Sequence, residues 1–170
     1  MTLYLNTNVA YKDFQMLRND KYFVDKSFII EKVNERVKTK NRFLCITKPR
    51  RFGKTSVLNM LGAYYGKAYP AGELFSGLKV SESPDFTIHL NKYNLISFSM
   101  NELPGKGKTY QDYIGRFEAN IRNDIREAYP QLDKKEFDSL SDLLTATGDE
   151  FIFVMEDEDF GIVAKRGNLC

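Results

Sequence analysis

Residues 42–55 read RFLCITKPRRFGKT, and this stretch decides the fold of the chain. Its first part, 42–47, is short and almost wholly apolar, which is typical of a buried strand. Residues 54–66 then carry apolar side chains at helical spacing on one stripe, at Val57, Leu58, Leu61 and Tyr65. Strand, tight loop and helix therefore follow one another around residues 48–55.

The loop between this strand and helix resembles the phosphate-loop pattern G-x-x-x-x-G-K-[ST], with Lys48 in place of the first glycine. Gly53 lets the backbone approach phosphates closely, and Lys54 can reach the outer phosphates. The Thr55 hydroxyl can hold Mg²⁺. Because Pro49 donates no N–H, the backbone cradle must come mainly from residues 51–55. The predicted nucleotide-binding residues are Lys48, Pro49, Arg50, Arg51, Phe52, Gly53, Lys54, Thr55 and Ser56.

Two readings stay open for Arg50 and Arg51: they contact phosphate, or they pair with acids of the domain. The ammonium of Lys54 is expected to face solvent when no ligand is bound. A nucleic-acid site would depend on this single basic loop, and the formal charge of the whole chain is only +2, so it is the weakest reading.

Residues 48–55 resemble the modified phosphate loop of bacterial proteins known as AAA-ATPase-like, which carry RPRRFGKS at this place. Residues 22–27, YFVDKS, resemble the YYVDK[ST] signature of the same family. The resemblance covers about residues 11–160 and implies an ATP-binding P-loop domain that lacks the first glycine as a family trait. Many members continue into an endonuclease-like domain, so the chain is expected to be only the N-terminal part of such a protein.

An apolar run at 151–155 leads directly into Glu156, Asp157, Glu158 and Asp159. In a P-loop site one acid holds Mg²⁺ and the next orients the attacking water. Family members have Asp-Glu here, so placement without gaps makes Glu156 the metal residue and Asp157 the catalytic one, with the two acids swapped. A shift by one residue would make Asp157 and Glu158 the pair, at the cost of a bulge. We predict metal binding by Thr55 and Glu156, catalysis by Lys54 and Asp157, and slow or absent turnover.

The remaining chain predicts the α/β class. Strands separated by helices indicate a three-layer, P-loop NTPase-like, mainly parallel sheet with helices on both faces. Residues 1–40 are expected to form an N-terminal arm and helix, and residues 41–170 a partial ATP-binding domain. The predicted elements are helices at 25–38, 54–66, 109–129 and 134–144 and strands at 42–47, 87–90, 93–100 and 151–155. Thr109, with Asp112 three residues on, is the expected N-cap of the third helix.

The sheet is expected to be incomplete at its C-terminal end. Only residues 160–170 follow the acids, and Gly161, Gly167 and Asn168 leave little room for a strand and helix. An unfilled place beside the strand at 43–47 would leave an open edge, and open edges pair with other chains. We therefore expect the chain either to self-associate through the gap or to close it with its own C-terminal segment.

Composition sets the remaining expectations. The chain is 42% hydrophobic and 28% charged, as in ordinary globular proteins, and no apolar run approaches the roughly 20 residues that cross a bilayer, so no membrane role is expected. Two cysteines, Cys45 in a predicted core strand and Cys170, favour a reducing cytoplasm. The one histidine, His89, is expected to be a bystander.

Two functions from different classes remain. The first is ATP binding with weak Mg²⁺-dependent hydrolysis, and the second is a truncated or degenerate module that binds a nucleotide or a partner without turnover. Tyr22, Phe23 and Asp25 precede the first strand, so they either line an adenine pocket or pack an N-terminal arm, and packing is favoured.

Overall fold

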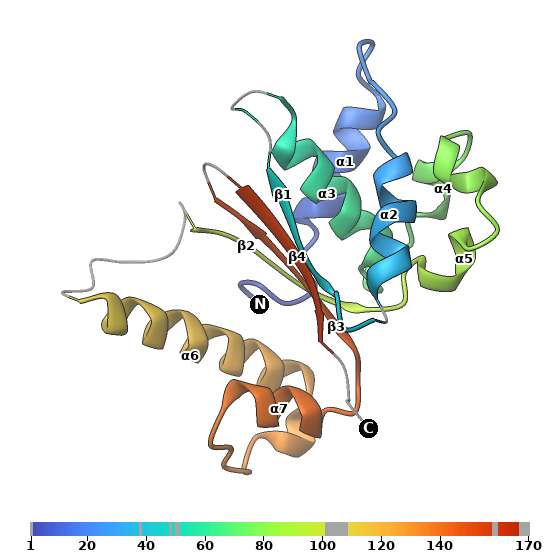
Figure 1. The fold of residues 1–170 in the computed structure, drawn as a ribbon. Helices are drawn as coiled ribbons and strands as arrows, with labels where there is room; N and C mark the ends of the chain where they lie inside the picture. The colour runs from blue at the N-terminus through green and yellow to red at the C-terminus, as the bar shows by residue number, and fades with distance from the viewer. Residues whose placement is uncertain are drawn as a thin grey trace.

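The computed structural model describes residues 2–37, 39–47, 49, 52–100, 109–157 and 160–166. A four-stranded sheet lies between two groups of helices, as Figure 1 shows. In chain order the elements are α1 (Val9–Arg18), α2 (Phe28–Val37), β1 (Phe43–Thr47), α3 (Lys54–Tyr65), α4 (Gly72–Phe75), η1 (Lys79–Glu82), α5 (Phe86–His89), β2 (Asn94–Ser99), α6 (Tyr110–Ala128), η3 (Pro130–Leu132), α7 (Leu140–Ala146), β3 (Phe151–Glu156) and β4 (Phe160–Arg166).

The sheet is mixed, with strand order β1-β4-β3-β2. β2 and β3 are parallel, whereas β4 is antiparallel to both β1 and β3. The expectation of a mainly parallel sheet was therefore wrong, although the α/β class holds. The reason is that β4 follows β3 after too few residues for a crossover, and so short a connection gives antiparallel pairing.

β4 fills the gap that the sequence predicted between β1 and β3. It pairs with β1 from Phe43↔Ala164 to Thr47↔Phe160 and with β3 along its other edge. A Cβ added to Gly161 would lie 2.7 Å from Cδ1 of Leu58, so the absence of a side chain lets β4 pass close under α3. The prediction that the C-terminal segment closes the gap is confirmed. Because β4 occupies the gap, the alternative expectation of self-association through it is not supported.

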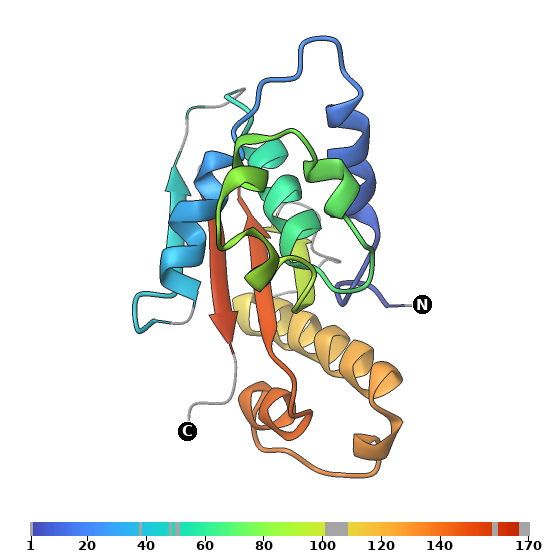
Figure 2. The ribbon, with the colours of Figure 1, turned by 90° about the vertical axis from the view of Figure 1, so that its right-hand side faces the viewer.

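The alternating side chains of the strands supply two hydrophobic cores, one on each face of the sheet. Leu95 and Ile152 belong to the core shared with α1, α2 and α3, and the neighbouring Ile96 and Phe151 to the core shared with α6 and α7. Figures 1 and 2 show α1–α5 on one side of the sheet and α6 with α7 on the other. α3 is buried along most of its length and forms the centre of the first core.

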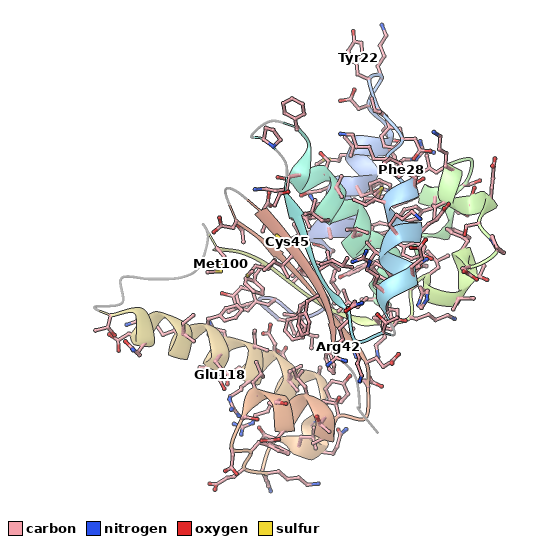
Figure 3. The ribbon with its side chains drawn as sticks, viewed as in Figure 1. Tyr22, Phe28, Arg42, Cys45, Met100 and Glu118 are labelled. Carbon is pink, nitrogen blue, oxygen red and sulfur yellow. The ribbon has the colours of Figure 1, made fainter. Side chains whose placement is uncertain are left out.

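β1 is a half-exposed edge strand and not the buried strand that was predicted. Leu44 and Ile46 pack on the first core, but Phe43 is 71% exposed and Cys45 is exposed too. The cause is that the second core is built by α6, α7 and the strands β2 and β3, which leaves the other face of β1 uncovered. In Figure 3 the labelled Cys45 lies on this strand, well above α6.

The sequence predicted the start of α6 but not the start of α7. The Thr109–Asp112 capping box starts α6 as predicted, and α6 ends before Pro130. The helix predicted at 134–144 begins later, at Leu140, because Ser139 and Asp142 form a second capping box. The strand predicted at 87–90 was wrong: this segment is the helix α5, preceded by Asp85. No helix among the described residues is both long and apolar enough to cross a membrane.

The N-terminal segment lies along the outer edge of β2. Leu5 forms an antiparallel bridge with Ile96, and the backbone N–H of Asn6 donates to the carbonyl of Leu95 at 2.7 Å. The buried carboxylate of Asp124 in α6 accepts hydrogen bonds from the backbone N–H groups of Leu3, Tyr4 and Leu5. One side chain therefore fastens this segment to α6.

Candidate phosphate-binding site

The loop between β1 and α3 ends in the geometry that exposes a helix N-terminus. Gly53 has φ 75° and ψ 35°, a left-handed conformation that glycine adopts without strain, and α3 begins at the next residue. Before it, the N–H of Phe52 donates to the carbonyl of Pro49 at 3.2 Å. The first N–H groups of a helix have no acceptor within it and carry the positive end of the helix dipole. This end of α3 is therefore suited to an anion.

The strand directions bring the end of β3 to the start of α3. Because β4 is antiparallel to β1 and to β3, those two strands are parallel to each other, and β2 runs with them. Their carboxyl ends lie at one edge of the sheet. There the Thr55 hydroxyl donates a hydrogen bond to the Glu156 carboxylate, although the two residues are 101 positions apart. The structure thus brings together the two residues predicted to hold the metal.

Lys54 also binds the end of β3. Its ammonium donates to the backbone carbonyl of Asp157, and the residue is only 9% exposed. The expectation that this ammonium faces solvent was wrong. The cause is the β3 terminus, which ends directly over the first turn of α3 and supplies a carbonyl acceptor.

Placement of the acids without a gap agrees with the course of β3. Pairing with β2 continues without a bulge from Asn94↔Phe151 to Ser99↔Glu156, so Glu156 is the last residue of the strand. Asp157 follows it, half-buried, and binds Lys54 through its main chain. Glu158 and Asp159 lie outside the described residues. The catalytic role of Asp157 stays a prediction.

The other predicted binding residues divide into two groups. Lys48, Arg50 and Arg51 lie outside the described residues. Of the remaining positions, Phe52 is 65% exposed and Ser56 is half-buried beside a cavity described below.

A cavity of about 250 Å³, lined by polar and apolar side chains, adjoins the Thr55–Glu156 pair. It is bounded by the carboxyl ends of β2 and β3, the N-terminal segment, α1 and the first turns of α3. In open α/β sheets, ligands bind outside the carboxyl ends of the strands. The cavity is lined by Leu3, Tyr4, Thr7, Val9, Asp13, Thr55, Leu58, Asn59, Ser97, Phe98, Ser99, Val154 and Glu156.

A second cavity of about 150 Å³ lies on the opposite side of the α3 N-terminus. Tyr22 and Phe23 line it and Asp25 does not. Phe23 also packs on the first core beside Phe14, as the favoured reading expected, and an adenine pocket here stays a prediction. The surface of this cavity is equally polar and apolar. The apolar side chains include Phe14, Leu17, Val57 and Met60, and Lys26 and Ser56 are polar members. Sequence reasoning did not single out Lys26, although the YFVDKS signature contains it.

The chain is similar to one family of known proteins over most of its length. A family model described as predicted AAA-ATPase matches residues 8–158. The chain belongs to the AAA-ATPase-like family. The part of the chain that matches includes β1, α3, β2 and β3 with Glu156 and Asp157. No curated protein and no solved structure matches the chain.

Membership of the AAA-ATPase-like family supports a general nucleotide-binding theme for the site. The donor set fits that theme, with a helix N-terminus, one ammonium and one hydroxyl–carboxylate pair at the same place. Among the described residues there is no group of three or more His, Cys, Asp and Glu side chains that could hold a metal ion.

Proposed function

We propose that this chain binds ATP with Mg²⁺ at the N-terminus of α3. The observation that carries the proposal is the meeting of Thr55 with Glu156 beside Lys54, at the helix end that follows a phosphate-loop sequence. The family description supports the choice of ATP. In this proposal the loop cradles the phosphates and Lys54 neutralises the outer ones.

The residues at the end of β3 and the start of α3 fit Mg²⁺. This ion prefers oxygen ligands and is commonly held by one or two protein groups together with nucleotide phosphates. Thr55 and Glu156 would supply a hydroxyl and a carboxylate oxygen. When bound, the ion would neutralise negative charge on the phosphates.

The contacts of Lys54 and Thr55 with the end of β3 determine what must change when a nucleotide binds. The donors of Lys54 and Thr55 are engaged by the end of β3 through Asp157 and Glu156. The Lys54 ammonium must exchange the Asp157 carbonyl for a phosphate oxygen when a nucleotide binds. Its contact with the carbonyl already has a charged donor, and a phosphate oxygen adds an opposite charge on the acceptor, which favours that exchange.

Binding without turnover is the alternative at the same site. Hydrolysis requires a carboxylate that orients the attacking water, and Asp157 is one methylene shorter than the Glu of the family pattern. A misplaced catalytic group loses the positioning on which rate depends. A phosphate-release assay with Mg·ATP separates the two functions, since only the first produces inorganic phosphate.

Calorimetric titration of ATP tests the binding proposal, with and without Mg²⁺. Lys54→Met keeps most of the apolar stem and removes the charge, so a folded variant is expected. We expect ATP affinity to fall by roughly ten- to a hundredfold, which corresponds to about 1.5–3 kcal/mol for one charge-assisted contact. Thr55→Val should remove only the part of the affinity that depends on Mg²⁺.

Unfolding curves of both variants serve as the control for the fold. Thr55 is exposed, so its substitution should leave stability unchanged. Equal ATP affinity in wild type and in a folded Lys54→Met variant would reject the proposed site.

A further inference from the structure

The tripeptide Asp25-Lys26-Ser27 is fixed by its two outer residues. The Asp25 carboxylate accepts from the N–H of Ser27 at 2.8 Å and from the N–H of Lys79 at 2.9 Å. Ser27 is fully buried, and its hydroxyl accepts from the N–H of Val80 at 3.1 Å. Burial raises the pKa of Asp25, but these backbone hydrogen bonds outweigh it and hold the pKa below its usual value. Asp25 and Ser27 therefore anchor the segment to η1.

Lys26, between the two anchors, reaches the phosphate loop. Its ammonium donates to the carbonyl of Phe52 at 3.4 Å, and it lies 3.0 Å from the place of a Cβ at Gly53. A lysine ammonium has three donors, so one long contact to a carbonyl leaves donors for a ligand. A side chain at position 53 would displace this ammonium. The lack of a side chain at Gly53 thus makes room for a cation from another part of the chain.

The cavity at Lys26 is suited to the nucleoside end of a nucleotide. Its apolar members come from α1, α3 and the segment that connects α1 with α2. Tyr22, at the tip of that connection in Figure 3, is 80% exposed. Its volume of about 150 Å³ lies below the about 300–1,000 Å³ of pockets that enclose whole drug-sized ligands. The volume is therefore enough for one ring system, with the phosphates at the polar members of the lining, Lys26 and Ser56.

We propose that Lys26 is a second phosphate-binding cation, supplied from outside the loop. It contacts the phosphates nearer the nucleoside, while Lys54 contacts the outer ones. The inference depends on the proposed ATP site and adds one ligand contact to it. It also gives the tripeptide a physical role: Asp25 and Ser27 position the segment, and Lys26 meets the ligand.

Calorimetric titration of the full chain with ATP, ADP and adenosine tests this assignment. Lys26→Met keeps the stem that borders the cavity and removes the charge. We expect roughly tenfold weaker binding of both ATP and ADP and unchanged binding of adenosine, because only a contact to phosphate is lost. Lys26→Arg should retain most of the affinity for ATP. Lys12→Met, which removes an exposed lysine of α1 outside the cavity lining, is the matched control.

Two results would overturn the inference alone. One is a Lys26→Met variant that binds ATP as wild type does while Lys54→Met loses affinity. The other is an equal loss for adenosine and ATP, which would mean that Lys26 only shapes the cavity. Absence of ATP binding in the wild-type chain would instead remove the proposed function and this inference together.

Discussion

Asp124 is expected to contribute more to stability than any exposed acid of the chain. It is 3% exposed, and its carboxylate receives the N–H groups of three consecutive residues at 2.7–3.0 Å. In Asp124→Asn one oxygen becomes an NH₂ group that cannot accept, and the charge is lost. Oδ2 accepts from all three N–H groups and can remain as the amide oxygen, so each contact loses its charge and Leu3 also loses its second acceptor, Oδ1.

The magnitude follows from those contacts. Hydrogen bonds to charged groups are worth about 1.5–3 kcal/mol each and those between neutral groups about 0.5–1.5 kcal/mol, so neutralising the acceptor of three contacts should cost about 2–4 kcal/mol. For a chain of this size 1 kcal/mol corresponds to about 2–4 °C in Tm, which gives a decrease of about 5–15 °C. Urea unfolding followed by circular dichroism measures the free energy, and a thermal scan measures Tm.

Asp138→Asn is the matched control, because Asp138 is an exposed acid between η3 and α7. It should change stability by less than about 0.5 kcal/mol. If Asp124→Asn is as stable as this control, the three backbone contacts do not fasten the N-terminal segment. Because Leu3 and Tyr4 line the cavity beside Glu156, a real loss of fastening should also weaken Mg·ATP binding.

Two further predictions concern Gly161 in β4 and Asp149, which precedes β3. Gly161→Ala should lower the free energy of unfolding by about 1–3 kcal/mol in a urea titration, because the added Cβ would overlap Leu58. The control Gly115→Ala in α6 meets no atom and should raise it by about 0.5–1 kcal/mol. Equal values for the two variants would refute the close passage of β4 under α3. Hydrogen bonds from Lys67 and then Tyr129 hold the pKa of Asp149 below its usual value. Its ionised form therefore stabilises the fold above about pH 4, and the contribution is lost as pH falls through the folded pKa. Asp149→Asn should lower stability at pH 7 by about 1 kcal/mol or less, since the ion pair is partly exposed, and the difference from wild type should shrink at pH 3; a difference that grows instead would contradict the sign.

Local signals in the sequence predicted the elements that position the site. The apolar run before the loop gave β1, the glycine–lysine–threonine step gave the start of α3, and the capping residue Thr109 gave the start of α6. Each depends on neighbours in the chain, so a single sequence suffices. The four-residue α5 carried no such signal, and its short pattern looked equally like a strand.

What the sequence could not reveal depends on contacts between distant residues. The exposure of β1 follows from where α6 and α7 lie, and the burial of Lys54 follows from the end of β3. Lys26 reaches the loop because η1 holds Asp25 and Ser27, and the residues that hold them are 54 and 53 positions away in the sequence. Periodicity and motif spacing contain no information on such contacts.

The mixed sheet preserves the arrangement on which a phosphate site depends. The site requires the carboxyl ends of β1 and β3 at one edge, and it does not require a particular direction for the strand between them. An antiparallel β4 holds β1 and β3 two strand spacings apart, about 10 Å, as a parallel strand would. At that separation the first turn of α3 reaches the end of β3, and Thr55 meets Glu156. The direction of β4 was predicted wrongly, yet Thr55 and Glu156 meet as predicted. Their contact depends on where β1 leads into α3 and where β3 ends, and not on the direction of the strand between them.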